Sequence, residues 1–314
     1  MGRMANEPTT LPAFADLPAG RTAKGLARPD LGVPVEIPWF AVRGAEPGPT
    51  LLVTAGVHGA EYASIEAAYR AAATDPAELA GTLLVLPIVT PPSFFARSIY
   101  VTPVDGANPN RVFPGRDDGG FSERLAAWLM RQAVDRADAW IDLHGGDLIE
   151  SLTPFSLVPE DDPVSRRLGE AFGLPLLIED DLDGTTATEG ARRGLPCVLA
   201  EAGGQGLWPE KAVVPLADGV GRALIHLGMR EGDLPPREVK TLTTFAWLRS
   251  EHAGLWRPRV AGGDPVTAGQ ELGVVTDLLG EVRQRAVAPQ DGVALFAVSS
   301  LAINAGDPLV GVGA

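Results

Sequence analysis

Two of the four histidines in the chain, His58 and His144, stand directly before a glycine at the end of an apolar run. Open α/β sheets place their ligands at strand ends of this kind. Glu61 follows His58 by three residues, so its carboxylate and the imidazole can converge as the chain turns into a helix. A catalytic Zn²⁺ takes three nitrogen or oxygen ligands from the protein and keeps a fourth position for water. The sequence predicts one Zn²⁺ per chain, held by His58, Glu61 and His144.

Hydrogen-bonded structural roles remain the alternative for an isolated H-G-x-E fragment, because short motifs match by chance. Asp142 stands two residues before His144, on the same face of the expected strand. It either orients that imidazole or simply faces a polar pocket.

Glu201 follows the apolar residues CVLA and precedes Ala-Gly-Gly, so a carboxylate reaches the edge of the sheet among small residues. Its fitting role is that of a general base, which takes a proton from a metal-bound water and returns it to the leaving amine. Asn110 and Arg111 lie in a proline-flanked loop, where an amide and a guanidinium can grip a substrate carboxylate together. A surface turn with a solvated arginine is the alternative for this pair.

Buried apolar runs alternate with helical segments over the first three quarters of the chain. We expect strands at residues 35–42, 50–57, 82–89, 139–143, 151–158, 174–178 and 197–200, and helices at residues 61–73, 121–136, 164–172 and 212–229. This alternation predicts an α/β fold with a sheet covered by helices on both faces. Residues 90–120 are rich in proline and lack periodicity, so we expect a long, functional connection there.

The composition changes at residues 232–237, GDLPPR, which read as a linker. We expect an extended lead-in at residues 1–34, a catalytic domain at residues 35–232 and a small all-β domain at residues 238–314. Short β-like runs separated by glycine-rich turns predict that last domain.

Lys and Arg number 26 against 40 Asp and Glu, which gives a net charge of −14. A field of this sign repels nucleic acid and anionic membranes, so neither is an expected partner. No apolar run is long enough to span a bilayer, and we expect a cytoplasmic protein. Cys197 is the single cysteine, which excludes an internal disulfide and cysteine-rich zinc sites.

Four motifs occur in order, GVHGAE, NPNRVFPG, IDLHGG and LAEAGG. In this order and at these spacings they resemble the succinylglutamate desuccinylase/aspartoacylase family, a branch of the zinc carboxypeptidase-like hydrolases. The resemblance spans about residues 35–314. It implies a zinc carboxypeptidase-like mixed sheet, Zn²⁺ on the predicted three ligands, Glu201 as catalytic carboxylate, and Asn110 and Arg111 as the carboxylate grip. Family members often have leucine where this chain has Pro109, which could stiffen the loop.

The resemblance also raises further candidates. Arg97, Arg192 and Arg193 are candidates for additional substrate contacts, and we include Arg97 in the expected substrate site. The C-terminal domain looks like the barrel-sandwich type of biotinyl and lipoyl carriers, but no lysine follows Lys240 to carry such a group. Partial covering of the site and contacts in a homo-oligomer are its expected roles.

The leading hypothesis is a zinc-dependent deacylase that cleaves the amide of a small N-acylated amino acid or related acid. A zinc carboxypeptidase acting on short peptides is the second hypothesis, and a non-catalytic protein that binds a metal or ligand is the third. An enzyme with Cys197 as nucleophile is the weakest, because a cysteine inside an apolar strand is usually buried and inert. The acyl group and the amine portion are not encoded by any motif.

Overall fold

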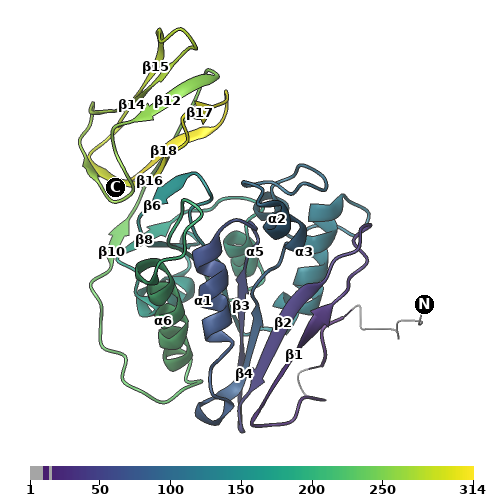
Figure 1. The fold of residues 1–314 in the computed structure, drawn as a ribbon. Helices are drawn as coiled ribbons and strands as arrows, with labels where there is room; N and C mark the ends of the chain where they lie inside the picture. The colour runs from purple at the N-terminus through teal and green to yellow at the C-terminus, as the bar shows by residue number, and fades with distance from the viewer. Residues whose placement is uncertain (1–9, 14–15) are drawn as a thin grey trace.

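The computed structural model describes residues 10–13 and 16–314 and contains one nine-stranded mixed sheet in its larger part (Figure 1). The strands lie in the order β1-β2-β4-β3-β5-β9-β7-β8-β10. Strands β4, β3, β5 and β9 form its parallel centre. Their bounds are β1 (Arg21–Ala27), β2 (Ile37–Arg43), β3 (Glu46–Ala55), β4 (Ala80–Leu86), β5 (Ala139–His144), β7 (Phe155–Val158), β8 (Leu176–Glu179), β9 (Cys197–Glu201) and β10 (Lys240–Leu242).

Helices cover both faces of this sheet because the central strands are apolar on both sides. In β3, Leu51 and Val53 enter the core beneath α1, α4 and α6, whereas Leu52 enters the core beneath α3 and α5. The helices are α1 (Tyr62–Ala71), α2 (Pro91–Ala96), α3 (Phe121–Gln132), α4 (Pro163–Phe172), α5 (Thr186–Arg192) and α6 (Glu210–His226), with short 3₁₀ turns η2 (Pro76–Glu78), η3 (Pro109–Arg111) and η4 (Val134–Arg136). The predicted α/β sheet covered by helices is confirmed.

Two smaller sheets form the C-terminal part, at the top of Figure 1. The first has the order β11-β18-β16-β13 with β6 added on β16, and the second has the order β15-β14-β12-β17. Their bounds are β6 (Glu150–Leu152), β11 (Phe245–Arg249), β12 (Gly254–Pro258), β13 (Pro265–Val266), β14 (Glu271–Thr276), β15 (Val282–Val287), β16 (Gly292–Val298), β17 (Ala302–Ile303) and β18 (Pro308–Gly313). A separate apolar core lies among these strands.

Each of the two parts contributes one strand to a sheet of the other part. Strand β6 leaves the body and pairs with β16, while β10 runs from the C-terminal segment and pairs with β8 of the main sheet. The segment at residues 151–158, expected as one strand, is therefore split between two sheets as β6 and β7. The division into domains at residues 232–238 stays a prediction.

The prediction of an extended lead-in outside the core at residues 1–34 is wrong for its second half. Residues 1–9 and 14–15 lie outside the described residues. Strand β1 pairs in antiparallel register with β2, and Ala27 and Leu31 are buried in the core. The sequence RTAKGLA did not predict a strand because it lacks a continuous apolar run. An edge strand with one exposed face keeps polar side chains.

The long connection at residues 90–120 is ordered and includes α2 and η3. Asp105 fixes it to the start of α3 by accepting hydrogen bonds from the backbone N–H and the hydroxyl of Ser122. The Thr102 hydroxyl donates to the same carboxylate at 2.7 Å. Within the described residues, no helix is both long and apolar enough to cross a membrane. The cytoplasmic location stays a prediction.

Candidate active site

Three side chains that are far apart in the sequence meet at the carboxyl edge of the main sheet. His58 lies in the turn after β3, Glu61 precedes the first residue of α1, and His144 is the last residue of β5. Strands β3 and β5 are parallel neighbours, so their carboxyl ends lie together. Gly145 allows a close approach there, since a Cβ atom would lie 2.3 Å from the carbonyl oxygen of Ala202.

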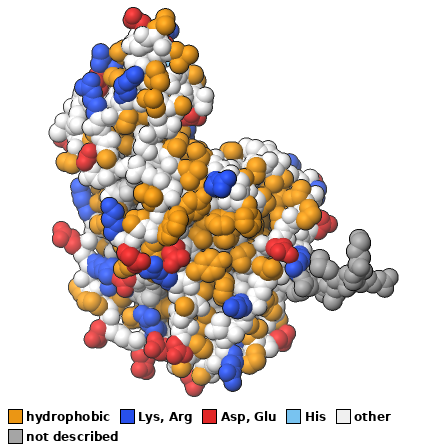
Figure 2. Space-filling model, in the orientation of Figure 1, with side chains coloured by type: hydrophobic (Ala, Val, Ile, Leu, Met, Phe, Trp, Pro, Cys, Tyr) orange, Lys and Arg blue, Asp and Glu red, His pale blue; other side chains and the backbone are white. Residues whose placement is uncertain are grey.

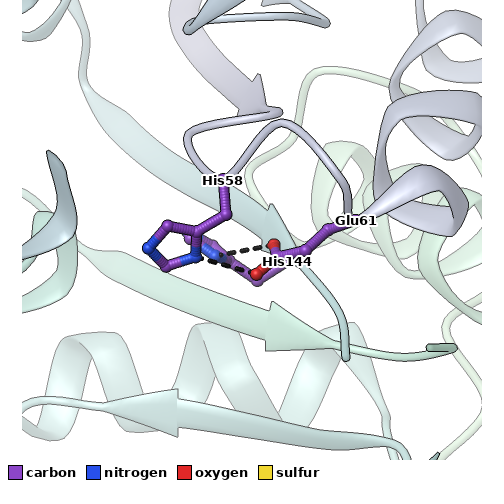
Figure 3. A group of neighbouring side chains, drawn as sticks. All are labelled: His58, Glu61 and His144. Atoms are coloured by element: carbon purple, nitrogen blue, oxygen red, sulfur yellow. Dashed lines mark hydrogen bonds and ion pairs between the residues drawn. The ribbon is translucent and has the colours of Figure 1, made fainter. Parts of the chain in front are cut away.

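The Glu61 carboxylate contacts both imidazoles, one with each oxygen (Figure 3). His58 Nδ1 is 2.8 Å from Oε1, and His144 Nδ1 is 3.0 Å from Oε2. The Gly145 backbone N–H also donates to Oε2 at 3.2 Å. One ligand atom from each of the three side chains lies within 4.8 Å of the other two. The predicted ligands are therefore brought to one point, with Glu61 and His144 buried.

The outer nitrogen of each imidazole contacts an oxygen. His58 Nε2 is 2.9 Å from Oδ1 of Asn108, and His144 Nε2 is 2.7 Å from Oδ2 of Asp142. An oxygen of this kind only accepts, so each Nε2 carries a hydrogen, and in the neutral ring Nδ1 keeps a lone pair. Both Nδ1 atoms point at the Glu61 carboxylate, and in the neutral form of the rings their lone pairs would be presented there to a metal ion.

The electrostatics of the cluster follow from its burial. Burial alone would raise the pKa of Glu61, but the two histidines outweigh it and hold that pKa at about 2. Burial alone would lower the pKa values of His58 and His144, but their carboxylate neighbours raise both. Two imidazole nitrogens and a buried carboxylate are a donor set that fits Zn²⁺. These residues therefore fit the metal that the sequence predicts.

Glu201 is the last residue of β9, in register with His144 on the adjacent strand β5. It lines the same pocket as the three candidate ligands. Burial, followed by the charge of Glu61, raises the pKa of Glu201 well above its usual range. Its Oε2 atom is buried and has no hydrogen-bond partner among the described residues. This carboxyl group is thus available to a proton or a ligand in the pocket.

Asn110 and Arg111 lie in η3 and line the pocket. Pro109 occupies the first position of this turn, and Asn108 caps it by accepting the Asn110 N–H. Asn110 is buried, and its Oδ1 accepts the N–H of Thr186 at the start of α5. Only its amide nitrogen is left for a substrate, beside the Arg111 guanidinium.

The pocket has a volume of about 330 Å³, which is within the usual range for small-molecule sites. Its walls come from both parts of the molecule. Tyr100 and Glu150 belong to the body, whereas Trp247 and Arg249 come from β11 in the C-terminal part. These four residues were not predicted from the sequence, because no local pattern connects them to the histidines. Asn108 begins the motif NPNRVFPG, but only Asn110 and Arg111 of that motif were predicted to act in the site.

Arg97 does not line this pocket, and the prediction that it contacts the substrate is wrong for this structure. It follows α2 in a left-handed conformation, φ 54°, and lies in a separate surface groove with Tyr62, Phe94 and Trp208. Hydrophobic side chains cover much of the centre of the face drawn in Figure 2. None of the residues that line this groove also lines the pocket with the candidate ligands.

The other two arginines that were candidates for substrate contacts form ion pairs at the surface instead. Arg192 pairs with Asp183, and Arg193 pairs with Asp135. Neither lines the pocket. Cys197 is buried, and burial raises the pKa of its thiol, so it is an inert core residue.

Comparisons with known proteins agree with this geometry. Residues 47–227 match the model of the succinylglutamate desuccinylase/aspartoacylase catalytic domain. An N-alpha-acetyl-L-2,4-diaminobutyric acid deacetylase from Halomonas elongata is 33% identical over 293 residues, which cover 88% of this chain and 84% of the relative.

Solved structures are also similar over nearly the whole chain. The product-bound ectoine utilization protein EutE (DoeB) from Ruegeria pomeroyi has a TM-score of 0.85 at 28% identity. A succinylglutamate desuccinylase/aspartoacylase from Rhodobacter sphaeroides has a TM-score of 0.84 at 27% identity. Each comparison covers 95% of this chain and 97% of the other.

Proposed function

The chain belongs to the succinylglutamate desuccinylase/aspartoacylase family of amide hydrolases, and we propose that it removes the acyl group from a small N-acylated amino acid with the help of Zn²⁺. The observation that carries the proposal is the convergence of His58, Glu61 and His144 beside Glu201 in one pocket. The products are a carboxylate and a free amine.

The relatives narrow the substrate class. One relative of 33% identity is named for the deacetylation of N-alpha-acetyl-L-2,4-diaminobutyric acid. We propose an N-acetylated amino acid of this size as the substrate. A pocket of about 330 Å³ supports a small molecule over a longer peptide. A small molecule is thus the proposed partner, and nucleic acid is not.

His58 and His144 would hold the metal through Nδ1, with Glu61 as the third ligand. A bound Zn²⁺ supplies a Lewis acid that polarises the amide carbonyl and acidifies a water molecule. Asn108 and Asp142 keep the two rings in the orientation that presents Nδ1, because each holds the opposite nitrogen. The chain itself would thus supply three metal ligands in fixed orientations.

Glu201 moves the proton. Its Oε2 has no partner among the described residues, and a carboxylate with a raised pKa is suited to accept a proton and release it again. It takes the proton from the attacking water and delivers it to the leaving nitrogen. Asn110 and Arg111 hold the substrate carboxylate while this happens.

The substitution Glu201→Gln tests the mechanism, since it keeps the shape of the side chain and removes the proton acceptor. We expect zinc content to persist while kcat falls by about 10²- to 10⁴-fold, the usual range for loss of a general base. The measurements are zinc content by mass spectrometry and release of amine from N-acetyl and N-succinyl amino acids. Glu231→Gln is the matched control, because Glu231 is exposed and outside the pocket.

Undiminished turnover of Glu201→Gln would remove Glu201 as the base. The same assay includes short peptides, which a carboxypeptidase would cleave in preference to acylated amino acids. Zinc binding without turnover of either class would support a non-catalytic ligand-binding protein.

A further inference from the structure

Strand β11 of the C-terminal part presents one face to the pocket. Phe245, Trp247 and Arg249 all line the pocket, as expected for alternate residues of a strand. The intervening Leu248 packs against the core of the C-terminal sheets. The pairing of β11 with β18 fixes this strand in its sheet, so the position of Arg249 is set by the fold of the C-terminal part.

The Arg249 guanidinium is oriented but its charge is not neutralised. Its Nη1 donates to the carbonyl oxygen of Gly306 at 2.9 Å, and its Cζ lies 5.5 Å from the centre of the Trp247 ring. Neither contact brings a negative charge. Among the residues that the structure describes, Arg249 forms no ion pair, unlike Arg70 or Arg131 on the surface.

Arg111, which lines the same pocket, also lacks a charged partner. Its Nη1 donates to the carbonyl oxygen of Asn110 at 2.7 Å, and it too forms no ion pair within the described residues. The pocket walls desolvate Arg111, and the positive charge of Arg249 acts in the same direction, so that its pKa is lowered. Asp180 and Glu201 counteract this from a greater distance than an ion pair.

Arg111 and Arg249 are both exposed, line the same pocket and form no ion pair within the described residues, so together they offer a binding position for an anion. Arginine suits a carboxylate in particular, because its planar fork donates two parallel hydrogen bonds. Asp180 and Asp307 also line the pocket, but among the described residues neither forms an ion pair with Arg111 or Arg249, and Asp307 Oδ2 accepts the Asn304 N–H at 2.8 Å. The two guanidinium groups can therefore take a carboxylate partner from a ligand.

We propose that Arg249 binds the free carboxylate of the substrate together with Arg111, and thereby makes the C-terminal β sheets a determinant of specificity. The inference rests on the proposed deacylase function and names its substrate class. Substrates are N-acyl amino acids with an unblocked carboxylate, whereas N-acyl amines and N-acyl amino acid amides are rejected. In this role Arg249 contacts the carboxylate and not the bond that breaks, so it contributes to binding more than to the chemical step.

Arg249→Ala should raise KM for an N-acetyl amino acid by about 10- to 100-fold, the loss expected for a hydrogen-bonded charge contact, with kcat little changed. Arg249→Lys should recover only part of this loss, because lysine keeps the charge without the fork. The matched amide, in which the carboxylate is replaced by a carboxamide, should react equally slowly with the wild-type protein and with Arg249→Ala. Arg283→Ala is the control, since Arg283 is exposed on β15 and outside the pocket.

Calorimetry with the free product amino acid gives a second measurement that does not depend on turnover. We expect the amino acid to bind the wild-type protein at least tenfold more tightly than Arg249→Ala, while thermal melting curves of the two coincide. Equal affinity, or an equal loss of activity toward the acid and its amide, would overturn the role of Arg249. Failure of the wild-type protein to hydrolyse any N-acyl amino acid would instead overturn the proposed function, and the calorimetric comparison would still decide the role of Arg249.

Discussion

Asp142 shows how one residue of the fold prepares a candidate ligand. It is fully buried and accepts hydrogen bonds from the hydroxyl of Thr54 at 2.5 Å and of Thr186 at 2.6 Å, besides its contact with His144. Trp140 donates to the Thr54 hydroxyl at 2.8 Å and extends the network into the core. A carboxylate that is held by several hydrogen-bond donors keeps the imidazole in one orientation.

Asp142→Asn should therefore weaken zinc binding by about 10- to 100-fold, the usual effect of losing such a support. Asparagine lacks the charge of aspartate, and its amide nitrogen cannot accept a hydrogen bond from either Thr54 or His144, whichever of the two it faces. Zinc affinity is measured by competition with a chelator. Asp138→Asn is the control, because Asp138 precedes the same strand and contacts the Thr50 backbone instead of a histidine. Equal zinc affinity in Asp142→Asn and the wild-type protein would contradict this role.

Sequence patterns succeed at the residue scale where the relation is local. The spacing of His58 and Glu61 and the position of His144 at a strand end indicated which side chains meet, and the resemblance of four motifs to a known family supported this prediction. Asn108 and Arg249 were missed because their contacts depend on how distant segments pack. Arg97 was wrong for the same reason, since charge alone does not say which groove a side chain enters.

Strand β6 joins the two parts of the molecule and carries a titratable group into the pocket wall. Glu150 accepts the Tyr100 hydroxyl at 2.8 Å and lies in register with Val298 of β16. Burial raises the pKa of Glu150 to about 7, and the charges of Asp147 and Glu61 add to the effect. Burial between the two parts of the molecule and the neighbouring carboxylates therefore favour the protonated form of Glu150.

A raised pKa makes folding stability depend on pH. Below about pH 4.5 Glu150 is protonated in both the folded and the unfolded chain, and between about pH 4.5 and 7 the folded state binds the proton more tightly. Stability contributed by this group is thus lost as the pH rises through that window, by about 3 kcal/mol at most.

Glu150→Gln should make the free energy of unfolding decline less steeply as the pH rises. The variant should therefore be more stable than the wild-type protein at pH 8, but no more stable than it at pH 4.5. The measurement is urea unfolding of chelator-treated protein across that range, because a bound cation would favour the ionised carboxylate. Asp147, whose pKa burial raises to about 6, should leave a residual slope. Parallel curves for the two proteins would show that Glu150 does not titrate in this way.

The elements that sequence predicted best are the central strands and the amphipathic helices. Continuous apolar runs identify β3, β4, β5 and β9 because both faces of these strands are buried. Helix α5 was missed because its sequence TATEGAR is short and polar, although most of it is buried by tertiary packing. Strand β6 was merged with β7 because periodicity does not tell which sheet a strand joins.

At the scale of the whole molecule, the pocket depends on both parts of the chain. The main sheet supplies the candidate ligands and Glu201, and β11 adds Trp247 and Arg249 to the lining of the same pocket. The sequence predicted the trailing β sheets and a covering role for them. It could not predict a charged contribution to the site, because the approach of β11 to η3 results from the packing of the two parts.

The central claim is that His58, Glu61 and His144 hold one Zn²⁺. The most direct measurement is anomalous X-ray diffraction at the zinc edge from crystals of the zinc-loaded protein. We predict one strong peak per chain, with Nδ1 of His58, Nδ1 of His144 and a Glu61 oxygen each about 2.0–2.2 Å from it. An active crystal form whose only zinc peak lies away from these three side chains would contradict the account.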